Sequence, residues 1–198
     1  MITAIGDVLR RCYERGWITS RDGNCSLRRA RSIYLSITPS GWRKTIIHPE
    51  HMIKIRVKDG VMEVPPGTKP SGELHMHFLL TKGMSKTRAV VHVHATNVVA
   101  AIYRGFDLQK ICADFPEIYR YTRIGPTVPT LPAVSTELGE ATARALGVTD
   151  TNPTGDFDIV GQANHGVCSM APDPWSAYEH VERLDHICEI VLKSGVSP

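Results

Sequence analysis

The sequence predicts a single α/β domain over residues 1–198, built around a mainly antiparallel sheet. A length of 198 residues is typical of one hydrophobic core. Strand and helix patterns follow one another without the strict alternation that parallel β-α-β units produce. The dipeptide Asp59-Gly60 joins two strand-like runs, as in an antiparallel hairpin.

The N-terminal third predicts one helix followed by strands. An apolar stripe at helical spacing opens the chain and Gly16 follows it, which indicates a helix that ends near residue 16. The segment "SIYLSITPSG" (32–41) alternates apolar and polar residues before a turn, and "MIKIRVKDGVMEV" (52–64) contains both hairpin strands. The stripe comprises Ile5, Val8, Leu9 and Cys12.

The middle of the chain predicts a loop, a helix and a buried strand. The Pro- and Gly-rich segment "PPGTKPSGELHMHFLL" (65–80) becomes helical near Ser71, which can cap a helix that has Glu73 in its first turn. The strand "AVVHVHA" (89–95) follows, and then a short helix in "NVVAAIYRG" (97–105). Prolines and a glycine interrupt residues 114–132, which indicates irregular structure.

The C-terminal part predicts two more helices and a strand. One helix covers about residues 135–146, and "IVGQANHGV" (159–167) forms a strand that runs into a loop. The last helix has Asp173 as its N-cap and Pro174 at its first position, and it stops at Gly195. Its apolar stripe consists of Tyr178, Val181, Leu184, Cys188 and Val191.

Composition and charge exclude several classes of protein. A net charge of +3, from 23 basic and 20 acidic residues, is too small to indicate a nucleic-acid partner. No apolar stretch reaches the length of a membrane span, and the N-terminal residues do not resemble a signal peptide. The five cysteines are widely spaced without a C-x-x-C pair, so we expect a cytoplasmic protein with no membrane partner.

Two histidines in the predicted strand 89–95 suggest a metal site. Side chains two residues apart on a strand share a face, so we expect His92 and His94 side by side, with Cα atoms about 7 Å apart. Such a pair can bind one metal ion, or each imidazole can simply be hydrogen bonded within the fold. His165, which precedes a glycine, supplies a third imidazole, and catalytic zinc sites often use three protein ligands.

Glu73 and three turns accompany these histidines. Glu73 follows the Ser71 loop, where its carboxylate can serve as a base or a ligand, or can simply stabilise the helix dipole. The segments "DGNCS" (22–26) and "TPSG" (38–41) are small, polar and glycine-containing, so their main-chain N–H groups suit an anion. Each turn taken alone is more typical of an ordinary loop.

Five short motifs occur in a fixed order along the chain: "GN" (23–24), "TPSG" (38–41), "KPSGE" (69–73), "AVVHVHA" (89–95) and "NHG" (164–166). This ordered set resembles the class II aldolase/adducin family, and the resemblance extends from about residue 5 to the last helix. It implies a three-layer α/β/α sandwich around a mainly antiparallel sheet. It also implies a homotetramer with active sites between neighbouring subunits.

The resemblance further implies a role for each candidate site residue. A divalent metal, usually zinc, would be bound by His92, His94 and His165, and Glu73 would be the acid/base that can also reach the metal. The implied reaction is retro-aldol cleavage of a small phosphorylated sugar through a metal-stabilised enediolate. The residues implied to hold the substrate phosphate are Asn24, Ser40, Gly41, Ser71 and Gly72.

Departures from the family pattern leave other reactions open. The tyrosines that help protonate the leaving aldehyde in fuculose-phosphate aldolases have no clear counterpart in "ICADFPEIY" (111–119) or before Pro198, so we expect a different substrate. Asp114 falls near the catalytic aspartate of the ribulose-phosphate 4-epimerases, although a turn or capping role also explains it. The alternatives are therefore a sugar-phosphate 4-epimerase, a methylthioribulose-phosphate dehydratase, a decarboxylase and an inactive metal-binding module.

Overall fold

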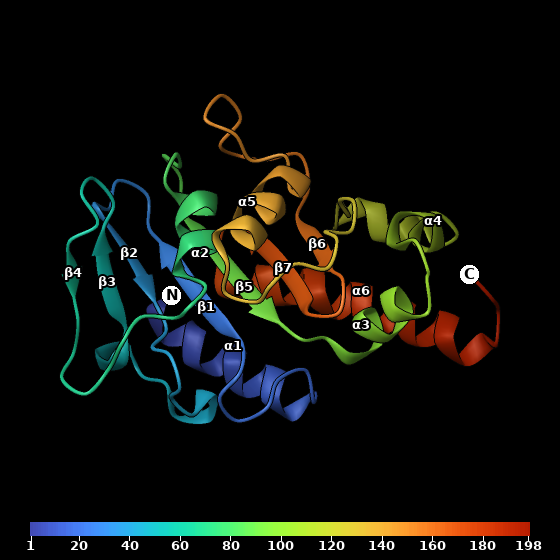
Figure 1. The fold of residues 1–198 in the computed structure, drawn as a ribbon, viewed down its shortest axis with the longest axis horizontal. Coiled ribbons are helices and arrows are strands. Elements are labelled where there is room, and N and C mark those ends of the chain that lie inside the picture. The colour runs from blue at the N-terminus through green and yellow to red at the C-terminus, as the bar shows by residue number, and fades with distance from the viewer.

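A seven-stranded sheet forms the middle layer of the protein (Figure 1). In this computed structural model, which describes residues 1–198, the strand order is β4-β3-β2-β1-β5-β7-β6. Every pair of neighbouring strands is antiparallel, which confirms the predicted type of sheet. The strands are β1 (Asn24–Arg28), β2 (Tyr34–Ile37), β3 (Ile53–Arg56), β4 (Met62–Glu63), β5 (Arg88–Val93), β6 (Ile159–Gln162) and β7 (Gly166–Ala171).

Helices cover both faces of the sheet, so the three-layer α/β/α architecture is confirmed. One face carries α1 (Ile2–Glu14), α3 (Thr96–Tyr103), α4 (Leu108–Ala113) and α6 (Pro174–Ser194), and the other carries α2 (Leu74–Thr81) and α5 (Thr136–Ala145). Short 3-10 helices lie in the connections: η1 (Lys44–Ile46), η2 (Pro49–His51) and η3 (Pro116–Arg120). None of the helices combines the length and the apolar character that a membrane crossing needs.

Side-chain alternation along β5 divides the interior into two cores. Ala89, Val91 and Val93 belong to the larger core, which α1, α3 and α6 cover, whereas Val90 belongs to the smaller core beneath α2 and α5. Successive strand residues point to opposite faces, so His92 shares the face of Val90. The strand therefore directs this imidazole toward the side of the sheet on which α2 lies.

Local signals located the first and last helices correctly. α1 ends at Glu14, and Gly16 follows in the left-handed conformation with φ of 71°. α6 begins after Asp173, whose carboxylate accepts hydrogen bonds from the main-chain N–H groups of Trp175 and Ser176. The same helix ends at Gly195, with φ of 77°, as its sequence predicts.

Four elements differ from the prediction. The second helix begins at Leu74 instead of near Ser71, because Ser71 starts a turn in which its hydroxyl accepts a hydrogen bond from the Glu73 N–H (3.3 Å). Glu73 consequently occupies the N-cap position and not the first turn. Asn24–Arg28 form β1, although the sequence predicts a turn over residues 22–26. The sequence predicts neither α4 nor β7, since α4 has only six residues and β7 is buried along its whole length, so neither shows a clear period.

Candidate metal and anion site

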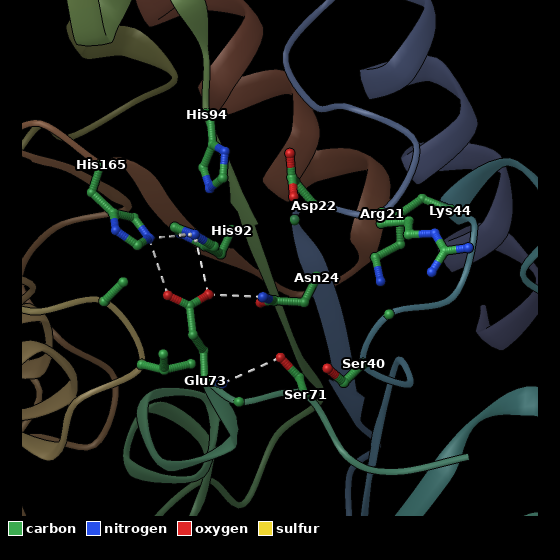
Figure 2. Close-up of a pocket in the computed structure, with 15 residues that line it drawn as sticks. Arg21, Asp22, Asn24, Ser40, Lys44, Ser71, Glu73, His92, His94 and His165 are labelled. Atoms are coloured by element: carbon green, nitrogen blue, oxygen red, sulfur yellow. Dashed lines mark hydrogen bonds and ion pairs between the residues drawn. The ribbon is translucent and has the colours of Figure 1, made fainter. Parts of the chain in front are cut away.

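The ends of three central strands surround a pocket of about 200 Å³ (Figure 2). Asn24 begins β1 and lies opposite His92 of β5 in the antiparallel register. His165 lies in the tight turn between β6 and β7, and β7 is the other neighbour of β5. The sheet topology thus brings together residues that are far apart in the sequence.

The structure gathers the three predicted histidines into one cluster. The ring centroids of His92 and His94 are 5.3 Å apart, those of His92 and His165 are 4.9 Å apart, and those of His94 and His165 are 5.3 Å apart. One nitrogen of each ring lies within 4.8 Å of those of the other two. His94 follows the last residue of β5, so the shared face of the pair extends just beyond the strand.

Hydrogen bonding and burial prepare His92 to donate a lone pair. Its Nδ1 donates a hydrogen bond to the main-chain carbonyl of Val167 (3.0 Å), which leaves Nε2 unprotonated and directed at His165 Nε2, 3.1 Å away. Burial lowers the pKa of His92 to about 4, although the neighbouring Glu73 carboxylate opposes this shift. Burial also lowers the pKa of His94. Both rings are therefore neutral at pH 7, the form that binds metals.

The Glu73 carboxylate lies against this cluster and is almost completely buried. Its Oε2 accepts a hydrogen bond from Asn24 Nδ2 (2.8 Å) and lies 3.1 Å from His92 Nε2, while Oε1 lies 3.1 Å from His165 Nε2 (Figure 2). Burial by itself would raise the pKa of Glu73, but the imidazoles of His92 and His165 and the Asn24 amide outweigh burial and lower it. The group is therefore an anion at neutral pH.

These donors fit a divalent metal ion. Glu73 Oε1 is buried and makes no hydrogen bond, and His92 Nε2 faces His165 Nε2 at a distance that two lone pairs tolerate only with a proton or a cation between them. Three imidazole nitrogens with a nearby carboxylate form a donor set that suits zinc and other transition metals.

A buried chain of hydrogen bonds holds Asn24 in place. His77 Nε2 donates to Asn24 Oδ1, and His77 Nδ1 accepts a hydrogen bond from Ser26 Oγ (2.7 Å). Burial lowers the pKa of His77 to about 3, so the ring carries a single N–H and cannot donate to both partners. With its oxygen bound to His77, Asn24 directs its NH₂ group at Glu73, and one of the two N–H bonds is left for a ligand.

The three predicted anion-binding turns line the same pocket. Pro39 and Pro70 form a bridge, and Ser40 N–H donates to the Lys69 carbonyl (2.8 Å), so the "TPSG" and "KPSGE" turns lie side by side. Gly72 has no room for a side chain, since an added Cβ would lie 2.3 Å from a methyl carbon of Val134. The candidate phosphate residues that meet here are Asn24, Ser40, Gly41, Ser71 and Gly72.

Asp114 is the one predicted site residue that the fold does not bring to the pocket. It is exposed, it follows the last residue of α4 in the C-cap position, and it is absent from the pocket lining. Its capping position is the turn role that the sequence left open. A catalytic role for Asp114 in the pocket of its own chain is not compatible with this location.

Sequence reasoning missed several residues that line the pocket or support it. Arg21 and Asp22 directly precede the "GN" motif, and Lys44 follows the "TPSG" turn by three residues. Val134 lines the mouth with φ of 59°, a strained value for a β-branched residue, and no local signal announces it. His77 could have been found, because it lies one helical turn after Glu73.

Comparisons with known proteins find similarity to one family over nearly the whole chain. The family described as "Class II Aldolase and Adducin N-terminal domain" matches residues 3–192. L-fuculose phosphate aldolase of Methanococcus maripaludis is 24% identical over 189 residues, covering 96% of this chain and 94% of the relative. The 3-oxo-tetronate 4-phosphate decarboxylase of Pectobacterium atrosepticum is 26% identical over 186 residues, covering 92% of this chain and 79% of the relative.

Solved structures share the fold. A sugar-phosphate aldolase from Thermotoga maritima superposes with a TM-score of 0.79 at 23% sequence identity. The match covers 100% of this chain and 97% of that protein.

Proposed function

The chain belongs to the class II aldolase and adducin family, and we propose that it is a divalent-metal-dependent lyase that cleaves a small sugar phosphate by retro-aldol chemistry. The observation that carries the proposal is the position of Glu73. Its buried carboxylate has one oxygen fixed by Asn24 and the other without a hydrogen bond, directly beside the cluster of three imidazoles. A general base and a Lewis-acid site are thereby adjacent in one pocket.

Each group of residues would have a distinct task. His92, His94 and His165 would hold the ion, which when bound would stabilise the negative charge that develops on the substrate oxygens as the carbon–carbon bond breaks. The "TPSG" and "KPSGE" turns with Asn24 would hold the phosphate and so fix the reacting carbon. Glu73 Oε1 would carry the proton to and from the carbon that gains the electron pair.

Glu73→Gln tests the assignment of the base. Glutamine keeps the shape of the side chain but cannot take up a proton, so turnover should fall at least about a hundredfold with metal content and substrate affinity retained. An exposed acid of the same charge, Glu137 in the first turn of α5, provides the control Glu137→Gln. Equal turnover of Glu73→Gln and the control would refute the role of Glu73.

The metal requirement has its own test. The purified protein should contain about one divalent ion per chain, and His94→Ala should lose it. If the protein held no divalent ion after dialysis against zinc, manganese and iron salts, the proposed metal-dependent lyase activity would be refuted. The remaining function would then be the inactive module.

Decarboxylation of a 3-oxo sugar-acid phosphate is the second candidate, because the similarity to the Pectobacterium decarboxylase covers almost the whole chain. Loss of carbon dioxide from such an acid and retro-aldol cleavage both leave an electron pair beside a carbonyl, so the same site serves either reaction. One metal-loaded sample assayed for cleavage, decarboxylation, dehydration and epimerisation separates them by product. Asp114 does not support epimerisation, because it does not line the pocket of its own chain.

We further propose zinc as the ion, a homotetramer as the assembly and the cytoplasm as the location. Three protein ligands that include imidazoles, with a fourth position left open, are the usual donor set of catalytic zinc sites. All five cysteines are buried and free, which is compatible with a reducing compartment. Light scattering of the purified protein should give four times the chain mass of 21.9 kDa.

A further inference from the structure

Lys44 is a buried cation on the wall of the pocket. The residue is 2% exposed and begins the short helix η1, three residues after the "TPSG" turn. Its ammonium donates a hydrogen bond to the Pro39 carbonyl (3.1 Å) and makes no ion pair with any carboxylate. It nevertheless lines the same pocket as Ser40 and Gly41.

An ammonium in this position destabilises the fold. Removal of a charge from water carries a large cost unless a counter-charge replaces the lost hydration, and one carbonyl offers only a partial charge. Burial accordingly lowers the pKa of Lys44 to about 8, although the Asp22 carboxylate partly offsets the effect. A methionine of similar length would fill the same space without this cost. Lys44 therefore lacks a structural reason to be a lysine.

The surroundings of Lys44 indicate which ligand would supply the missing charge. The polar turns at 40–41 and 71–72 lie on its side of the pocket, and the histidine cluster lies on the other side (Figure 2). Arg21 is drawn beside Lys44 and adds a second, exposed cation. Two cations beside such turns match the two negative charges of a phosphate better than the single charge of a carboxylate.

We propose that Lys44 is a specificity-determining residue that binds the phosphate group of the substrate as a dianion, with Arg21 as an outer cation. This inference rests on the proposed function in its choice of a phosphorylated substrate. The inference adds selection of the substrate by charge: the buried ammonium excludes sugars that have no phosphate and binds monoanions weakly. The main-chain turns provide the shape of the subsite and Lys44 provides its charge preference.

The test compares Lys44→Met with Lys58→Met, in which an exposed lysine between β3 and β4 loses the same charge. Calorimetry of the metal-loaded proteins with inorganic phosphate should show affinity at least about tenfold weaker for Lys44→Met and unchanged for Lys58→Met. Urea unfolding should show Lys44→Met to be at least as stable as the wild type. If Lys44 were only structural, Lys44→Met would bind phosphate as well as the wild type and would be less stable in urea.

The possible outcomes separate this inference from the lyase assignment, because phosphate binding is measured without turnover. Loss of phosphate affinity in Lys44→Met supports the inference even when no sugar phosphate is cleaved by any variant. Unchanged phosphate affinity in Lys44→Met, or no phosphate binding by the wild type, overturns it even when cleavage is observed. Where cleavage is observed, Lys44→Met should lower kcat/KM for dihydroxyacetone phosphate condensation and leave that for free dihydroxyacetone unchanged.

Discussion

Replacement of His77 by leucine should lower both the stability of the fold and the rate of the reaction, although His77 does not line the pocket. Its ring is the only hydrogen-bond partner of Ser26 Oγ and of Asn24 Oδ1, and all three side chains are buried. Leucine leaves two buried polar atoms unsatisfied, at about 1–3 kcal/mol each, so the free energy of unfolding should fall by about 2–6 kcal/mol. Urea unfolding at pH 7 measures this directly.

The effect on turnover follows from Asn24. Without His77 the Asn24 amide is free to rotate, and its N–H group no longer has to face the Glu73 carboxylate. A hydrogen bond to a charged group contributes about 1.5–3 kcal/mol, which corresponds to a loss of about 10- to 150-fold in kcat if it fixes the base for reaction. The Michaelis constant should rise less than kcat falls, because Asn24 is only one of the residues proposed to hold the phosphate and the turns at 40–41 and 71–72 are untouched.

Two further variants separate positioning from general damage. His77→Gln keeps an N–H that can reach Asn24 Oδ1, so it should recover most of kcat while remaining less stable than the wild type. Addition of His77→Leu to Asn24→Ala should cost little further kcat, since both changes remove the same interaction. Fully additive losses of kcat, or a normal kcat in His77→Leu, would refute the positioning role.

Three other outcomes follow from the site. Val134→Gly should raise the free energy of unfolding by about 0.5–1 kcal/mol in urea, because glycine accepts the φ of 59° and the valine is largely exposed. Gly72→Ala should destabilise by about 1–3 kcal/mol through its clash with Val134, and Val134→Gly in the same chain should restore most of the loss. The metal-free protein should lose stability as the pH falls from about 6.5 toward 4. In the folded chain the pKa values of His77 and His92 are about 3 and 4, so within this pH range only the unfolded chain takes up protons at these two residues. Each histidine contributes a slope of about 1.4 kcal/mol per pH unit, and His77→Gln should remove one of them, as urea midpoints across this pH range would show.

Local chemistry made part of the fold predictable from the sequence. α1 and α6 were located from their apolar stripes and terminal residues, because caps and periods are encoded within one or two turns. The start of α2 was misplaced, since the Ser71 hydroxyl bonds the Glu73 N–H in a turn that precedes the helix. β7 has neighbours on both sides and both faces, so its buried small residues show no alternation.

The candidate site divides in a similar way. Strand geometry alone puts His92 and His94 on one face. The glycine after His165 and the loop before Glu73 made these two residues candidates, and the motif order joined all four in one site. Long-range contacts determined the rest: the bridge between Pro39 and Pro70 brings two turns together across thirty residues of sequence. No pattern near Lys44 indicates that its ammonium ends beneath one of these turns.

His77 and Lys44 are both buried and basic, and their different environments predict opposite behaviour. His77 is neutral and has a partner for each ring nitrogen, so the fold needs the residue and its loss should reduce stability. Lys44 has a single carbonyl partner and no ion pair, and the more distant Asp22 carboxylate offsets its burial only in part, so its loss should not reduce stability. A buried polar group that the folded chain satisfies positions its neighbours, whereas one that the chain leaves unsatisfied is available to a ligand. On this reasoning, the stability of the two variants, measured before any substrate is known, distinguishes the support of the base from the phosphate subsite.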